Sequence, residues 1–77
     1  MHYTITTMTA DCGSQILTLD KHGNQYMVNF HDKNTAESTH KTFKTIDEAE
    51  KVFLKIASCF IHSYYSAKDR AEMLKNA

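Results

Sequence analysis

The side chains of this 77-residue chain that could do chemistry are five histidines, two cysteines and a group of carboxylates. The histidines are spread along the whole chain, at His2, His22, His31, His40 and His62. A zinc site needs three or four ligands at close spacing, and the chain contains neither an H-E-x-x-H nor a C-x-x-C motif. We therefore expect no metal site and no cofactor.

Cys59 and His62 are the closest pair of metal-ligand type, three positions apart on a predicted helix. On that helix Cys59 lies at the edge of the apolar face and His62 points away from it. We interpret Cys59 as a small buried hydrophobic residue and His62 as a surface residue. Cys12 follows Asp11, and an adjacent negative charge disfavours the thiolate that a nucleophilic cysteine needs.

The carboxylates Asp47, Glu48 and Glu50 cluster where a helix is predicted to begin. Negative charge there complements the positive end of the helix dipole, so they are interpreted as helix-start residues and not as an acid–base pair. The chain has two glycines, too few for a glycine-rich loop that cradles phosphate. No catalytic group remains, and the sequence predicts a protein that is not an enzyme.

The pattern of elements predicts one α+β domain over residues 1–77. We expect an antiparallel β-meander of three to four strands, packed against one long amphipathic helix and followed by a short C-terminal helix. The predicted strands cover about 2–8, 15–20, 25–31 and 37–43, and the predicted helices cover about 46–64 and 67–76.

Alternation of apolar and polar residues defines the strands. The first strand is predicted to place Tyr3, Ile5 and Thr7 on one face and Thr4, Thr6 and Met8 on the other. Residues 15–31 form the clearest hairpin, with a turn at Gly23. Residues 37–43 are polar, and we expect an exposed edge strand that Lys41 protects from further pairing.

Two capping boxes predict where the helices begin. Thr45 and Glu48 open the first helix, and Ser66 with Asp69 opens the second. A single bent helix that continues to Asn76 is the alternative. The first helix carries a long apolar stripe, at 49, 52, 53, 56, 57, 60, 61 and 64. The second is predicted to place four residues on one side, namely Ala67, Arg70, Ala71 and Leu74.

The apolar arc of the first helix is wider than one sheet face can cover. Leu54, Ile61 and Tyr65 adjoin the main stripe on one flank. The C-terminal helix folding back, a second copy of the chain or a target protein could each cover this flank. Tyr64 and Tyr65 end the helix, and tyrosine is favoured at interfaces. The predicted partner-binding residues are Leu54, Ile61, Tyr64 and Tyr65.

Charge and composition narrow the classes of partner. The 9 basic and 9 acidic residues cancel, so the basic footprint of a nucleic-acid-binding protein is missing. A small DNA-binding regulator stays as an alternative, because Lys44, Lys51 and Lys55 lie near one side of the predicted first helix. The order of strand, helix and helix over 37–76 is also similar to that of ribbon-helix-helix repressors. A homo-oligomeric structural domain is the other alternative.

The sequence also predicts the compartment. No stretch approaches the 18 apolar residues of a membrane span, and residues 1–20 have no apolar core of a signal peptide. Two cysteines far apart do not make the disulfide framework of a small secreted domain. We expect a cytoplasmic protein with reduced thiols.

Residues 15–53 resemble a segment of the small phage-encoded type I-F anti-CRISPR proteins. The shared features are a strand, an Asn/Gly turn, an alternating strand, a polar strand ending in Phe43 and a helix opened by Thr45. The resemblance covers about half the chain and carries over no contact residue. It implies a non-enzymatic, often dimeric protein that inhibits a host defence complex by steric occlusion, in the host cytoplasm.

Overall fold

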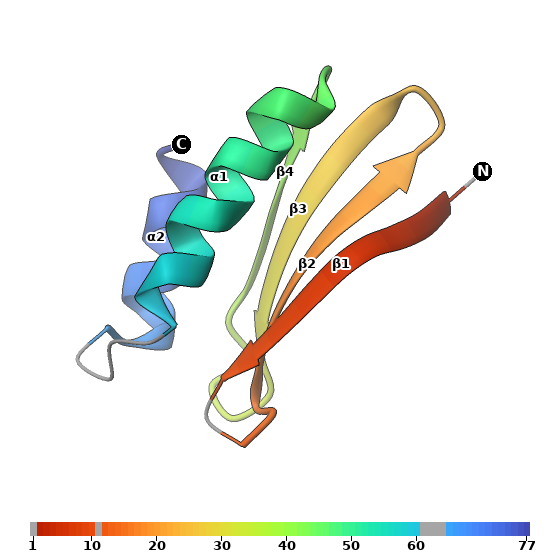
Figure 1. The fold of residues 1–77 in the computed structure, drawn as a ribbon. Helices are drawn as coiled ribbons and strands as arrows, with labels where there is room; N and C mark the ends of the chain where they lie inside the picture. The colour runs from red at the N-terminus through yellow and green to blue at the C-terminus, as the bar shows by residue number, and fades with distance from the viewer. Residues whose placement is uncertain (1, 11, 61–64) are drawn as a thin grey trace.

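Four antiparallel strands form one sheet, and the two helices that follow them in sequence cover one of its faces (Figure 1). The computed structural model describes residues 2–10, 12–60 and 65–77. The elements are β1 (His2–Ala10), β2 (Gln15–His22), β3 (Gln25–Asp32), β4 (Ser38–Phe43), α1 (Ile46–Cys59) and α2 (Ala67–Lys75). The sheet order β1-β2-β3-β4 is that of a meander, and the predicted α+β class is confirmed.

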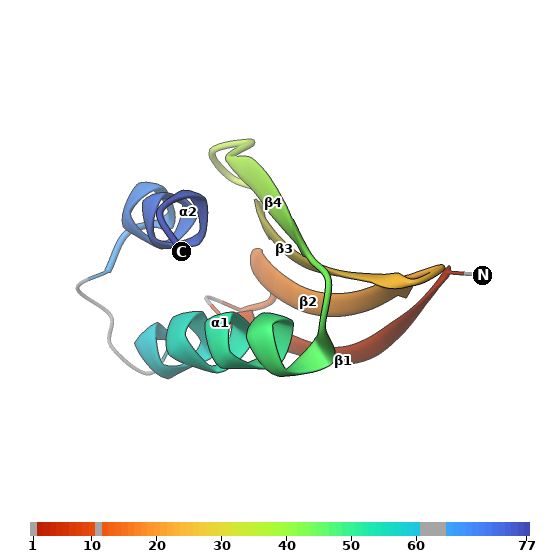
Figure 2. The same cartoon turned by 90° about the horizontal axis from the view of Figure 1, so that it is seen from above.

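Both helices lie on the same side of the sheet (Figure 2). α1 packs mainly on β2 and β3, while α2 packs on β3 and β4 and beside α1. β1 therefore lies at the edge of the sheet farthest from α2. Of the described elements, no helix covers the opposite face of the sheet.

The β2–β3 hairpin forms as predicted, but its strands are longer than expected. His22 pairs with Gln25, so the turn contains only Gly23 and Asn24. Gly23 has φ +59°, and a positive φ at the first residue of a two-residue turn is what a type II′ hairpin requires. The short turn extends β2 to His22, two residues beyond the predicted end.

The predicted alternation of β1 is wrong beyond Thr4. The pairing with β2 shifts by one residue at Ile5, because Thr4 is opposite Asp20 whereas Thr6 is opposite Leu19. This irregularity has the form of a β-bulge, which moves every later side chain to the other face. Residues opposite one another share a face, so β1 places Tyr3, Thr6 and Met8 on the helix side and His2, Thr4, Thr7 and Thr9 on the other.

β4 is an edge strand, as predicted. Lys41 lies opposite Val28, a core residue, so its side chain starts on the helix side of the sheet. Its Nζ donates to the backbone carbonyl of Ala77, just past α2. Lys41 thus ties the C-terminal residue to β4, and α2 packs against the same strand.

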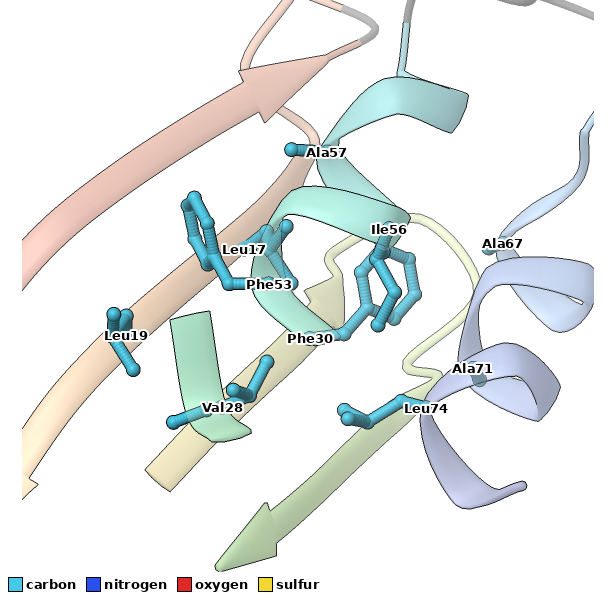
Figure 3. Close-up of a cluster of buried hydrophobic side chains, with 11 residues drawn as sticks. Leu17, Leu19, Val28, Phe30, Phe53, Ile56, Ala57, Ala67, Ala71 and Leu74 are labelled. Atoms are coloured by element: carbon cyan, nitrogen blue, oxygen red, sulfur yellow. The ribbon is translucent and has the colours of Figure 1, made fainter. Parts of the chain in front are cut away.

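The core fills the space between the sheet and the two helices (Figure 3). Leu17 and Leu19 of β2 lie opposite Phe30 and Val28 of β3, so four buried side chains form its floor. The buried hydrophobic cluster comprises Leu17, Leu19, Val28, Phe30, Ala49, Phe53, Ile56, Ala57, Ala67, Ala71 and Leu74.

Side-chain caps fix where both helices begin. Thr45 accepts from the Glu48 backbone N–H at 3.2 Å, while the Glu48 carboxylate accepts from the Thr45 hydroxyl at 2.9 Å and not from its backbone. Ser66 and Asp69 form the complete, reciprocal capping box. Ser66 is extended (φ −80°, ψ 168°), so a second helix starts there and the alternative of one continuous helix to Asn76 is wrong.

α1 is shorter than predicted. It ends at Cys59, with Phe60 as its C-cap, whereas the apolar stripe predicted a helix to Tyr64. The last part of the predicted range, residues 61–64, lies outside the described residues. The apolar spacing continues past the helix end because Phe60 also packs on the core, against Phe30 at 6.3 Å between ring centroids.

The four residues predicted to share one side of α2 form its buried side, which includes an arginine. Ala67, Arg70, Ala71 and Leu74 are all buried, and Arg70 is only 2% exposed. The Arg70 guanidinium donates to the Gln15 side-chain carbonyl on β2 and, at 3.0 Å, to the Cys59 backbone carbonyl at the end of α1. It also lies 4.7 Å from the centroid of the Phe60 ring. One side chain therefore joins α2, α1 and β2.

The core and the exposed flank of α1 should respond differently to the same substitution. Leu17→Ala should lower the free energy of unfolding by about 2–5 kcal/mol, because Leu17 is fully buried and leaves a cavity. Leu54→Ala is the matched control, and its exposed side chain should change stability by no more than about 0.5 kcal/mol. Urea unfolding followed by circular dichroism measures both values. Equal losses would contradict the described packing.

Arg70→Met should lower the free energy of unfolding by about 2–4 kcal/mol, because it keeps the length of the side chain but removes hydrogen bonds from a charged donor. Lys68→Met on the exposed side of α2 should change it by no more than about 0.5 kcal/mol. The same urea titration compares the two. A neutral Arg70→Met variant would show that the guanidinium does not hold α2 in place.

Candidate functional site

The face of the sheet opposite the helices gathers four of the five histidines. We call it the open face, and it is formed by alternate strand residues: His2, Thr4, Thr7, Thr9, Ile16, Thr18, Asp20, His22, Gln25, Met27, Asn29, His31, Ser38, His40 and Thr42. His2 and His22 are paired across β1 and β2, with ring centroids 4.0 Å apart. His62 lies outside the described residues.

The open face is polar but almost uncharged. It contains no lysine or arginine, and its one carboxylate is Asp20. Within the described ranges, no three His, Cys, Asp or Glu side chains are grouped so that they could hold a metal ion. The face therefore offers hydrogen-bonding groups and threonine methyl groups, and it offers no cluster of cations for phosphate.

Asp20 is the centre of a hydrogen-bond network on the open face. One carboxylate oxygen, Oδ2, accepts from Asn29 Nδ2 at 2.8 Å and from Thr18 Oγ1 at 3.4 Å, and His2 Nε2 lies 3.7 Å from it. Asp20 is only 7% exposed, and no described residue donates to its second oxygen, Oδ1. The sequence predicts Asp20 as the last residue of a strand but does not predict this network, because only the strand pairing brings Asn29 and His2 beside it.

The two cysteines differ in environment. Cys59 is buried, and its Sγ lies 3.4 Å from Met73 Sδ on α2 and 3.6 Å from the Lys55 carbonyl oxygen. It therefore packs as the predicted small hydrophobic residue. Cys12 is exposed in the β1–β2 turn, with φ +57°, next to Gly13 at φ +87°.

The carboxylates at the start of α1 have the structural role that the sequence predicts. Asp47 and Glu48 lie in the first turn of α1, and Glu48 takes part in the cap with Thr45. Asp47, Glu48 and Glu50 are all exposed, and no pocket forms among the residues that the structure describes. Nothing in this geometry pairs them for proton transfer.

The predicted partner-binding flank of α1 is exposed where the structure describes it. Leu54 is 58% exposed, the largest value among the exposed hydrophobic residues of the described chain. α2 does fold back onto the sheet, but it packs on the opposite flank of α1, where Cys59 contacts Met73. The C-terminal helix therefore does not cover Leu54, and two of the three predicted occupants remain: a second copy and a target protein.

The other three predicted contact residues give less evidence for an exposed contact surface. Tyr65 is half-buried in the segment that precedes α2. Ile61 and Tyr64 lie outside the described residues. Of the two predicted contact residues that the structure describes, Leu54 has the exposure expected of a contact residue.

β1 carries a set of exposed apolar residues that the sequence does not predict. Tyr3 is 50% exposed, Ile5 38% and Met8 37%. Tyr3 and Met8 point to the helix side of the sheet, but the helices pack on β2, β3 and β4 and leave β1 uncovered. The polar composition of residues 37–43 predicts that β4 is an exposed edge strand. The strand order makes β1 the other edge strand, and the composition of β1 gives no such signal.

Exposed apolar residues therefore come from two neighbouring parts of one side of the molecule. α1 lies between α2 and the β1 edge, so the flank of α1 that faces away from α2 is on the β1 side (Figure 2). At about 100° per residue, Ile46 and Leu54 each lie about 140° around α1 from Cys59, which contacts α2, so both are on that flank. Ile46 is 39% exposed. We call Tyr3, Met8, Ile46 and Leu54 the β1–α1 surface.

Searches against protein-family models, curated proteins and solved structures find no match to this chain. No helix in the described part of the chain is long and apolar enough to cross a membrane.

The thiols should react at very different rates. Cys12 should react with a thiol reagent such as DTNB in the folded protein, while Cys59 should react at least about 100-fold more slowly, because it must wait for local opening. Cys12→Ser should remove the fast phase, and urea should expose the slow thiol. Two fast thiols in the folded wild type would contradict the burial of Cys59 between α1 and α2.

Proposed function

We propose that this chain is a non-enzymatic protein-binding protein, encoded by a phage or mobile element, that inhibits a host defence complex by steric occlusion. The observation that carries the proposal is the β1–α1 surface, on which Leu54 of α1 and Tyr3 of β1 are each at least half exposed. An 8.8 kDa chain has little apolar surface to spare from its core, so exposed large side chains there indicate a binding role.

The composition of the surface favours a protein partner. It offers an aromatic ring, a thioether and two aliphatic side chains, which are the residue types that bury well in protein interfaces. Lys44, Lys51 and Lys55 are exposed, but Glu48 and Glu50 are exposed among them and the net charge of the chain is zero. This distribution gives no support to the alternative of a DNA-binding regulator, whose affinity would depend on clustered cations.

The proposed mode of action needs no chemistry from the chain. A rigid two-layer domain that buries its apolar surface on a partner blocks whatever that part of the partner would otherwise contact. The type I-F class of target comes from the resemblance of residues 15–53, and the β1–α1 surface is where we place the contact. The host cytoplasm is the compartment in which such a target would be met.

The proposal can be tested with a purified type I-F defence complex and the full chain. We expect the wild type to bind and to block target-DNA binding by the complex. Leu54→Glu should weaken binding by about 30-fold or more, because charge in the centre of an apolar contact removes a hot spot. Thr42→Glu is the matched control, since Thr42 is an exposed residue on the open face of β4, away from the β1–α1 surface.

Both variants should keep the wild-type circular dichroism spectrum and urea midpoint. Absence of binding by folded wild type would overturn the proposed target class. Equal binding by Leu54→Glu and wild type would remove Leu54 from the contact.

A further inference from the structure

β1 is a long edge strand that no other described element pairs with or covers on its outer side. It comprises nine residues, His2–Ala10, and among the described elements it pairs with β2 alone. Nine residues of strand span about 30 Å, close to the longest dimension of the molecule, 34 Å. All its residues except Ala10 are exposed, so both its faces and its outer edge are accessible.

β1 lacks most of the features that prevent edge strands from pairing. Proteins protect such edges with charged residues, proline, bulges or a covering helix. The sequence HYTITTMTA contains no Lys, Arg, Asp, Glu or Pro. The bulge at Ile5 is the one protective feature present, and it leaves Thr6–Ala10 in regular pairing geometry.

β4, at the other edge of the sheet, is protected. α2 packs against it, and its Lys41 is held by the Ala77 carbonyl. The sheet therefore has one edge open to pairing and one that is obstructed. A single open edge permits a closed pair of chains and not an endless stack of sheets.

We propose that two copies of this chain associate through β1, which pairs antiparallel with β1 of the second copy about a two-fold axis. In antiparallel pairing about a two-fold axis, every residue of β1 lies opposite another residue of the same sequence, so the strand must tolerate its own side chains across the pair. Like charges opposite one another are destabilising, and β1 has no Lys, Arg, Asp or Glu. Its threonines and its exposed Tyr3, Ile5 and Met8 are residue types that favour cross-strand contacts.

The pairing produces one continuous eight-stranded sheet. The two helices of each copy lie over β2, β3 and β4 of that copy, away from the central β1 pair. The pairing satisfies the outward backbone groups of β1 and places its side chains beside those of the second copy. It does not depend on the proposed function, because it uses the outer backbone edge of β1. Tyr3 and Met8 belong to the β1–α1 surface as well, but the target contact is tested at Leu54 of α1, which packs over other strands. A second copy is one of three occupants that the sequence allows at the flank of α1, and the present proposal places it at β1 instead.

Sedimentation equilibrium of the full chain tests the proposal. The wild type should have a mass twice the 8.8 kDa of one chain, and this mass should fall towards that of the monomer on dilution. Ile5→Lys should raise the dissociation constant by about 100-fold or more, because it adds a like charge from each copy to the same uncharged strand pair. Thr42→Lys on β4 is the matched control and should leave the dissociation constant unchanged.

Circular dichroism and urea midpoints establish that the variants fold, and a second measurement on the wild type needs no variant. Hydrogen exchange of the β1 amides should slow at high protein concentration and quicken on dilution, while exchange in β4 stays constant. A wild type that is monomeric at about 100 μM would overturn the proposal. So would a dimer whose β1 amides show no dependence on concentration, or one that only Thr42→Lys dissociates.

The outcomes of this test are separable from those of the inhibition test. Leu54→Glu should stay dimeric while it loses its target, and Ile5→Lys should become monomeric whether or not a target exists. A dimeric wild type that binds no defence complex would sustain the β1 pairing and remove the proposed function.

Discussion

The hydrogen bonds of the buried Arg70 side chain fix the position of α2 and so the part of the sheet that α2 covers. The guanidinium joins α2 to the end of α1 and to Gln15 of β2, and the ring of Phe60 packs against it. A buried guanidinium is tolerated only where hydrogen bonds replace its hydration, so α2 is held where those acceptors are. This position puts α2 over β3 and β4. As a consequence, α2 covers neither β1 nor the side of α1 that faces β1.

The uncovered parts connect the two proposals. Leu54 and Tyr3 offer side chains to a partner, whereas the outer edge of β1 offers backbone hydrogen-bonding groups. A strand that pairs through its edge keeps its side chains perpendicular to the sheet, so pairing through β1 leaves Tyr3 and Met8 on the helix side. A dimer would therefore present two copies of the β1–α1 surface, which would allow two contacts on one target.

Local signals in the sequence predict much of the fold. The β2–β3 hairpin follows from alternation around Gly23, and the starts of both helices follow from Thr45 and Ser66, because each depends on residues a few positions apart. Helical periodicity predicts that Ala67, Arg70, Ala71 and Leu74 share one side of α2, but the burial of Arg70 depends on its acceptors on β2 and α1. The end of α1 and the bulge at Ile5 do not follow, because the core continues past the helix and the bulge depends on pairing with β2.

The candidate site is harder to predict because exposure depends on which element covers which. The width of the apolar arc on α1 predicts that the sheet does not cover Leu54, and Leu54 is exposed in the structure. The exposure of β1 depends on strand order and on the position of α2, neither of which a local pattern encodes.

The most direct test of this account is the solvent exposure of individual methyl groups, measured by NMR with a soluble paramagnetic probe and a dilute sample. The account predicts strong broadening at Leu54 and Ile5 and little at Leu17 and Leu74. Leu54 methyl groups as protected as those of Leu74 would contradict it.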